Sequence, residues 1–244
     1  MRRFYSEVVG QAGDIVSLDK EQSIHITRVL RFQPEDQVEL FDGCGGVSRA
    51  LIVSTGKYVV LRVVERLAQQ LAGGPQLWLC QGDLKGKKMD LVVQKSTELG
   101  VSRLLSVISS RSQGRVSVER SKKKQLRWRK LMESACKQCG RLIFMETGEI
   151  SFTELVTAPE LDDCDLRLLF WEKEKACLLK DLDWRYRYKK ICILLGPEGG
   201  FSEEEVALAK GSGWVSTGLG PLVLRAETAA IATASILLHR LGRI

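Results

Sequence analysis

The chain has 244 residues, of which 44% are hydrophobic and 27% charged, as in an ordinary soluble globular protein with one large or two small domains. No apolar run approaches the roughly 20 residues of a membrane helix, and the N-terminus lacks a signal peptide's apolar core, so we expect a cytoplasmic protein. Seven irregularly spaced cysteines and only two histidines argue against a disulfide framework and predict no metal site.

The net charge of +7 is concentrated in the middle of the chain. Residues 1–74 are neutral, residues 75–150 carry +9, and residues 151–244 carry −2. A localised excess of positive charge is typical of a protein that binds a polyanion, and no membrane feature competes with nucleic acid as the partner. The alternative is that lysines 122–124 and their neighbours form only the solvated face of a helix.

Short alternating segments fill the first part of the chain. They predict strands at residues 14–18, 37–41, 48–53 and 58–64, with a hairpin turn at 42–46. The helical pattern in this part covers residues 23–30. We therefore expect a small β-barrel over residues 1–72, with a Gly-Gly-Pro linker at its end.

From residue 76 onward, predicted strands alternate with predicted helices. The strands are expected at 77–80, 101–108, 166–171, 191–195 and 214–219, and the helices at 89–99, 119–139 and 226–241. Strands that are apolar throughout are expected where helices cover both faces of a parallel sheet. Residues 73–244 therefore predict an α/β domain with a parallel sheet covered by helices.

A glycine-rich segment, Gly196-Pro197-Glu198-Gly199-Gly200, separates a predicted buried strand from a helix start. Ser202 and Glu205 have the spacing of a capping box, so the helix begins directly after the glycines. Ligands of open α/β sheets bind at the carboxyl ends of the strands. The segment has neither the P-loop pattern nor the dinucleotide fingerprint. Three glutamates in the first turn of the helix also disfavour a phosphate, so we expect the loop to bind an uncharged or cationic group. A merely tight turn is the alternative.

Two further strand ends resemble this one. Residues 217–221 are glycine-rich and precede the last predicted helix, and the strand at 166–171 is followed by the acidic residue Glu172. Because parallel strands end at one edge of a sheet, these three ends are expected to wall a single pocket.

Several motifs together resemble the RsmE family of the SPOUT superfamily. They are Lys85–Asp90, Gln94–Val101, Gln138–Arg141, Gly196–Gly200, Leu224–Thr228 and, near the N-terminus, His25–Arg31. Members of this family methylate N3 of a uridine in small-subunit (16S) ribosomal RNA. The resemblance spans nearly the whole chain and departs from the family at the turn 34–36, where Pro-Glu-Asp replaces the usual Gly-Asp.

The resemblance implies an RNA-binding, PUA-like β-barrel at residues 1–72 and a SPOUT-type trefoil-knot methyltransferase domain at residues 73–244. It also implies S-adenosyl-L-methionine as methyl donor, S-adenosyl-L-homocysteine as product, ribosomal RNA of the small subunit as partner, and a homodimer. The cofactor contacts carry over onto Phe170, Trp171, Glu172, Leu195, Gly196, Pro197, Gly199, Gly200, Leu219, Gly220, Val223 and Leu224.

Methyl transfer from a sulfonium needs placement of the reactants and no metal. Since a histidine base is not obvious, we hypothesise that Arg225, with Lys95, holds the uracil and favours its anion by charge. The alternative for Arg225 is an ion pair with Glu227 or Glu198. Glu198 is the second candidate catalytic residue. Glu198 and Glu172 are the candidates for acidity near the sulfonium, and the alternative for Glu198 is that it braces the loop by pairing with an arginine.

The predicted RNA contacts are basic residues of the middle segment and of the first domain. They are His25, Arg28, Arg31, Lys85, Lys87, Lys88, Lys95, Arg111, Arg115 and Arg141, with the cluster at 120–130 extending the surface. For His25 the alternative is a structural role. The alternatives for the whole protein are a ribose 2′-O-methyltransferase of the same superfamily and a non-catalytic RNA-binding factor of ribosome assembly.

Overall fold

The computed structural model describes residues 1–67, 73–112, 118–184 and 187–244, so the predicted RNA contact Arg115 lies outside the described residues. The chain folds into two compact units. The first contains Met1–Gly73 together with Glu133–Phe144, and the second contains Gly74–Met132 and Met145–Ile244. No pattern in the sequence indicates that residues 133–144 group with the N-terminal unit.

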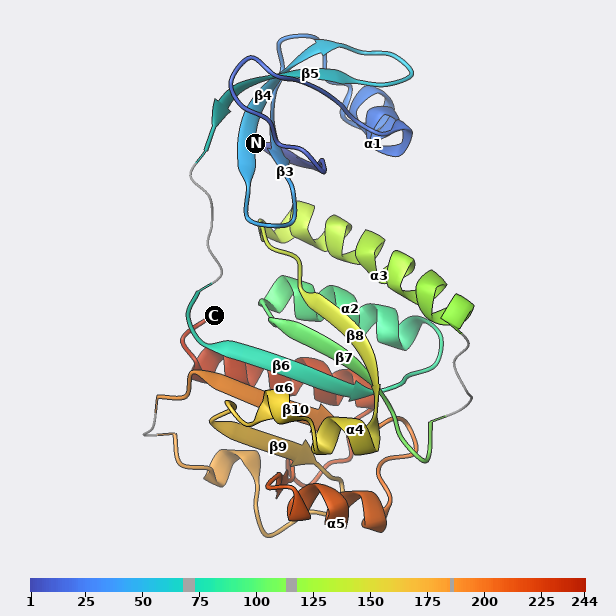
Figure 1. Cartoon of the computed structure of the whole chain (residues 1–244), viewed down its shortest axis with the longest axis vertical. Coiled ribbons are helices and arrows are strands. Elements are labelled where there is room, and N and C mark those ends of the chain that lie inside the picture. The colour runs from blue at the N-terminus through green and yellow to red at the C-terminus, as the bar shows by residue number, and fades with distance from the viewer. Residues whose placement is uncertain (68–72, 113–117, 185–186) are drawn as a thin grey trace. The chain divides into compact units, whose positions relative to one another are not determined.

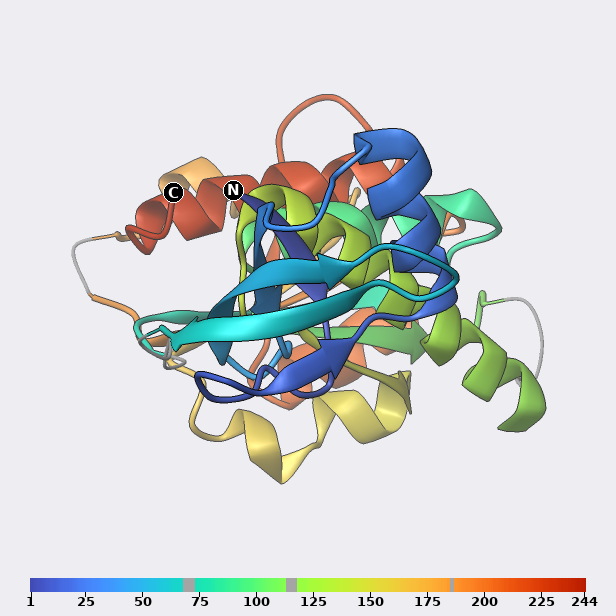
Figure 2. The ribbon, with the colours of Figure 1, turned by 90° about the horizontal axis from the view of Figure 1, so that it is seen from above.

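The first unit is built on a five-stranded sheet, seen from above in Figure 2. Its strand order is β1 (Arg2–Tyr5), β3 (Gln37–Phe41), β4 (Val47–Ser54), β5 (Val60–Arg66) and β2 (Ile15–Ser17). β1 pairs with β3 in parallel, and the other neighbours are antiparallel. The predicted strands are confirmed, β1 was missed, and closure into a barrel stays a prediction.

The helical segment of this unit begins earlier than the sequence predicts. α1 (Lys20–Ile24) is capped by Asp19, whose carboxylate accepts the backbone N–H of Gln22 at 2.8 Å. It continues into a π-helical turn, His25–Leu30, and ends at Arg31, which has a positive φ of 57°. The capping contact explains the earlier start, because an N-cap carboxylate satisfies a free donor of the first turn.

Residues 139–144 are joined to the first unit by backbone contacts. The N–H of Phe144 donates to the carbonyl of Gly43 at 2.8 Å, and Cys44 forms a bridge with Ile143. The guanidinium of Arg3 donates to the carbonyl of Gly140 at 2.8 Å. These long-range contacts, rather than the composition of residues 139–144, place the segment in the first unit.

The second unit contains a six-stranded sheet (Figure 1). Its order is β11 (Val215–Thr217), β9 (Leu166–Phe170), β10 (Lys190–Leu195), β6 (Gln76–Gly82), β7 (Arg103–Ile108) and β8 (Glu146–Ser151). All neighbouring strands are parallel, which confirms the predicted parallel sheet. β8 was missed, because its sequence, ETGEIS, lacks a run of apolar residues.

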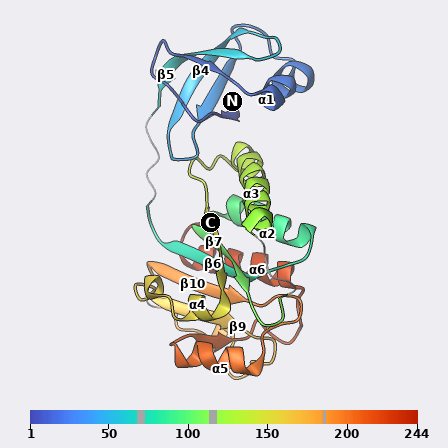
Figure 3. The ribbon, with the colours of Figure 1, turned by 45° about the vertical axis from the view of Figure 1, so that its right-hand side comes forward.

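Helices cover both faces of this sheet, as Figures 1 and 3 show. α2 (Lys87–Leu99) and α6 (Ala226–Arg240) pack together on one face. α4 (Phe152–Val156) and α5 (Glu203–Gly211) cover the other, where their apolar side chains join a core with those of β6, β7, β9 and β10. The two-sided burial explains why these strands are apolar throughout.

The cap predicted for α5 is present. The hydroxyl of Ser202 accepts the backbone N–H of Glu205 at 3.2 Å, and the carboxylate of Glu205 accepts the N–H of Ser202 at 2.9 Å. This reciprocal pair starts the helix directly after Gly196–Gly200 and so defines the end of that loop.

A polar cluster joins the first part of α3 (Val118–Cys139) to the sheet. The ammonium of Lys124 lies 2.5 Å from Asp83, 2.7 Å from Glu149 and 2.9 Å from the hydroxyl of Ser106. The Lys124, Asp83 and Glu149 side chains are only 19%, 27% and 12% exposed. Lys124 is therefore not part of a solvated helix face. Its neighbour Lys123 lies 3.4 Å from Glu119, with both side chains exposed.

Replacing Lys124 with alanine is expected to lower the free energy of unfolding by about 1–3 kcal/mol, because two poorly solvated carboxylates lose their cation. Urea denaturation followed by tryptophan fluorescence measures the change. The matched control is Lys123→Ala, which removes an exposed pair and should stay within about 0.5 kcal/mol of the parent protein. Equal stability of the two variants would contradict the assigned role.

Candidate active site

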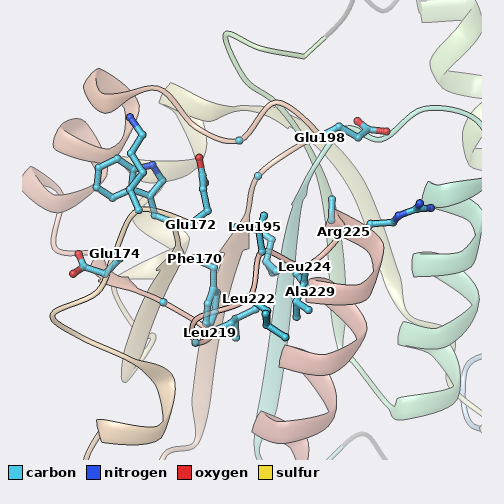
Figure 4. A pocket seen from close by; sticks show the side chains of 18 of the residues that line it. Phe170, Glu172, Glu174, Leu195, Glu198, Leu219, Leu222, Leu224, Arg225 and Ala229 are labelled. Atoms are coloured by element: carbon cyan, nitrogen blue, oxygen red, sulfur yellow. The ribbon is translucent and has the colours of Figure 1, made fainter.

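Three neighbouring strands of the second unit end beside one another. β11, β9 and β10 are adjacent in the parallel sheet, so their carboxyl ends lie at one edge. The segments that follow them line an open cavity of about 1200 Å³ (Figure 4). The expected single pocket is therefore present in the structure.

Backbone hydrogen bonds tie two of these segments together. The N–H of Trp171 donates to the carbonyl of Thr217 at 3.1 Å, and the N–H of Gly218 donates to the carbonyl of Cys177 at 2.8 Å. The N–H of Leu179 in turn donates to the carbonyl of Gly218 at 2.9 Å. The segments after β9 and β11 thus form one continuous wall of the cavity.

Glycine is required where the segment after β10, Gly196–Gly200, meets its neighbours. Gly200 has a φ of +66°, and a Cβ added there would lie 2.9 Å from a carboxylate oxygen of Glu172. At the end of β6, a Cβ on Gly82 would lie 2.3 Å from the backbone nitrogen of Pro197. The glycines therefore allow main chain to approach both a neighbouring strand and the cavity.

All residues predicted to contact the cofactor line this cavity. They are Phe170, Trp171, Glu172, Leu195, Gly196, Pro197, Gly199, Gly200, Leu219, Gly220, Val223 and Leu224. In Figure 4, Leu195, Leu219 and Leu224 lie in the middle of the view, with Glu172 and Glu174 to one side and Glu198 and Arg225 to the other. The cavity therefore has an apolar centre between two charged sides.

The cavity has further lining residues that were not among the individually predicted cofactor contacts, although some of them lie within the predicted segments. They are Lys173, Glu174, Lys175, Leu178, Gly218, Pro221, Leu222, Ala226, Glu227 and Ala229. Most of them adjoin the motif loops, and a wider window around each strand end would have included them. Leu178 and Ala229 carry no local signal, because the hydrogen bonds of Gly218 and the first turns of α6 bring them to the wall.

Arg225 lines the cavity as the residue before the first turn of α6. Among the described residues, no ion pair joins its guanidinium to Glu198 or Glu227. Lys95, its suggested helper, forms an ion pair with Glu98 at 2.8 Å and is not among the residues that line the cavity. The structure thus brings Arg225, but not Lys95, to the pocket.

The carboxylate of Glu198 is held by the start of α2. It accepts from the ammonium of Lys88 at 3.0 Å and from the backbone N–H of Lys85 at 3.3 Å. Burial alone would raise the pKa of Glu198, but the hydrogen bonds from Lys88 and from backbone N–H groups lower the pKa below its ordinary value. Glu198 therefore braces the loop, with a lysine in place of the expected arginine, and its catalytic role stays a prediction.

The predicted RNA contacts divide between the two units. In the second unit, Lys85 and Lys87 are exposed beside the half-buried Lys88, and Arg111 donates to the carbonyl of Gly199 at 2.7 Å. In the first unit, His25, Arg28 and Arg31 are exposed on or beside the π-helical turn. The guanidinium of Arg141 donates to the carbonyl of Ile143.

Within the described ranges, no three histidine, cysteine, aspartate or glutamate side chains are grouped so as to hold a metal ion. None of the described helices has the length and hydropathy that crossing a membrane requires.

Comparisons with known proteins agree with this geometry. Residues 73–238 match the model of an RNA methyltransferase domain, and residues 18–64 match that of an RNA methyltransferase PUA domain. The structure resembles that of a methyltransferase from Legionella pneumophila solved with bound SAM, at 32% identity and a TM-score of 0.86, over 97% of this chain and 96% of that one.

Two proteins named ribosomal RNA small subunit methyltransferase E are also similar. One, from Neisseria gonorrhoeae and solved with S-adenosyl methionine, is 29% identical over 98% of this chain and 97% of its own, with a TM-score of 0.83. The other, from Bacillus subtilis, is 26% identical over 98% of this chain and 97% of its own length. This chain therefore belongs to the RsmE family of RNA methyltransferases.

Proposed function

We propose that the protein transfers a methyl group from S-adenosyl-L-methionine to N3 of a uridine in small-subunit (16S) ribosomal RNA. The observation that carries the proposal is the single cavity walled by three strand ends, which lies within the region matched by the RNA methyltransferase model. Relatives solved with the methyl donor bound support the choice of cofactor.

The cavity has features that suit this cofactor. Among the described residues, Trp171 Nε1 and one carboxylate oxygen of Glu227 are buried without a hydrogen-bond partner, and both residues line the cavity. Buried polar atoms normally have partners, so these two favour a ligand that supplies them. Main-chain groups of residues 195–200 and 219–224 would hold the adenosine, and the carboxylate of Glu172 favours a cation. When bound, the cofactor supplies a methyl group on an electrophilic sulfonium.

Arg225 is the residue proposed to act on the uracil. Its guanidinium lies on the opposite side of the apolar centre from Glu172 and Glu174 in the view of Figure 4. There it would donate to a uracil carbonyl oxygen and stabilise the anion formed when N3 loses its proton. Neither His25 nor His239 is among the cavity-lining residues, so we propose that the proton passes to solvent.

Basic residues of both units are proposed to bind the RNA backbone. Lys85 and Lys87 are exposed near the start of α2, beside the cavity-lining Lys88. His25 and Arg28 are exposed in the part of the first unit that matches the PUA model. Contacts of this kind are sequence-independent and weaken with salt.

We also propose the finer features of the family, namely a threaded C-terminal chain and a homodimer. Leu91 of α2 and Ile236 of α6 are 38% and 45% exposed, on the two helices that pack together. Exposed apolar side chains on one face favour a second copy of the chain as partner.

Light scattering after gel filtration tests the dimer. We expect twice the 27.3 kDa of the chain, because burial of the exposed apolar side chains of α2 and α6 favours association. Ile236→Glu should shift the mass toward that of a monomer. Leu126→Glu, which changes an exposed apolar residue of α3, is the control and should leave the mass unchanged. A parent protein that elutes with the mass of one chain would contradict the proposal.

The reaction is tested by incubating small ribosomal subunits with the protein and the methyl donor, followed by mass spectrometry of nucleosides. We expect 3-methyluridine, whereas a methylated ribose would support the 2′-O-methyltransferase instead. Arg225→Ala should lower turnover by at least about tenfold with little change in cofactor affinity, because a charge that stabilises the transition state is lost. Unchanged turnover would remove Arg225 from the mechanism.

The cofactor site is tested by calorimetry with S-adenosyl-L-homocysteine. Gly200→Ala is expected to weaken binding by about tenfold or more, because the added methyl group meets Glu172 at a positive φ. The control is Gly211→Ala in α5, where an added Cβ meets nothing within 4 Å. If the parent protein gives no heat of binding with S-adenosyl-L-homocysteine, the result would instead favour a non-catalytic RNA-binding factor.

A further inference from the structure

The loop Gly196–Gly200 is held by side chains of segments that lie far from it in the sequence. Gln81, at the end of β6, donates from its amide nitrogen to the carbonyl of Gly196 at 2.8 Å. Lys88 contacts Glu198, and Arg111 contacts the carbonyl of Gly199. The loop therefore depends on contacts that lie 80 or more positions away in the sequence for its conformation.

Lys88 acts on the loop through Glu198. Its ammonium and the backbone N–H of Lys85 share one carboxylate oxygen of Glu198, at 3.0 and 3.3 Å. These contacts keep the pKa of Glu198 low, so the carboxylate is ionised at neutral pH and the ion pair persists. The centre of the loop is thus tied to the start of α2.

Arg111 acts on the loop through the main chain. Its guanidinium donates to the carbonyl of Gly199 at 2.7 Å, a charge-assisted bond that fixes the orientation of the Gly199–Gly200 peptide. The preceding N–H, that of Ser110, donates to the carboxylate of Glu205 at 2.7 Å. The segment after β7 therefore holds both the glycine loop and the first turn of α5.

These cations belong to the basic middle segment, where sequence alone predicts RNA contacts. We propose that Lys88 and Arg111 are positioning residues of the methyl-donor pocket, which hold the Gly196–Gly200 loop in its binding conformation and so act on cofactor affinity. The proposal rests on the proposed function, since it assumes that this loop binds the cofactor. It assigns both residues a role that needs no RNA.

Calorimetry with S-adenosyl-L-homocysteine, in the absence of RNA, tests the proposal. We expect Lys88→Ala and Arg111→Ala each to weaken binding by roughly 3- to 10-fold, the range for loss of one partly exposed charged contact. Lys87→Ala removes an exposed lysine that, within the described part of the chain, makes no side-chain hydrogen bond or ion pair with the loop, and it should bind the compound as the parent protein does. Thermal unfolding of each variant verifies that it is folded.

Two further variants separate positioning from a general loss of structure. Lys88→Arg keeps a cation for Glu198 and should restore most of the affinity. Lys88→Ala combined with Glu198→Ala should bind no more weakly than Lys88→Ala alone, because the two residues act through one contact.

The outcomes are distinct. Parent-like affinity of both alanine variants for S-adenosyl-L-homocysteine, with weaker binding to ribosomal RNA, would overturn the positioning role and make both residues RNA contacts. A parent protein that gives no heat would overturn the proposed function and the positioning role with it. Weaker cofactor binding in both variants, with Lys87→Ala unchanged, supports the proposal.

Discussion

The close approach of main chain to main chain at the ends of β6 and β10, beside the end of β9, is the constraint on which the pocket depends. At Gly82 a single added carbon atom would overlap the backbone of Pro197, and at Gly200 it would meet the carboxylate of Glu172. Parallel neighbours bring the strand ends to one edge, but only residues without a Cβ allow the following segments to pack this tightly. The apolar centre and the charged sides of the cavity are arranged around that contact.

Much of this architecture could be predicted from the sequence, for a physical reason. Strands buried on both faces are apolar throughout, so β6, β9 and β10 stand out, and the capping box at Ser202 marks where the loop must end. β1 and β8 could not be found in this way. β8 lies at the edge of its sheet with half-exposed polar residues, and β1 has one buried side chain, Phe4, between basic and polar neighbours. For such strands, hydrogen bonding to a distant partner decides the structure.

The lining of the cavity could be predicted well from the glycine-rich and acidic segments after β9, β10 and β11, because these segments follow the strands directly. The charged residues were harder to interpret, since a sequence shows the sign of a charge and not its partner. Lys88, Arg111 and Lys124 all contribute to the positive middle segment, yet each contacts a group within the second unit. Their partners Glu198, Gly199 and Glu149 lie 25 or more positions away in the sequence.

This internal pairing changes what the charge excess means. The +9 of residues 75–150 overstates the positive charge available to phosphates, because Lys88 and Arg103 are paired with Glu198 and Glu160, two acids outside the segment. Counterion release depends on the phosphates actually neutralised, and the salt dependence of RNA binding therefore follows the exposed cations rather than the net charge. We therefore propose two separate tasks for the basic segment. Its paired members contact the glycine loop and the sheet, and its exposed members, such as Lys85 and Lys87, are the ones we propose as RNA contacts.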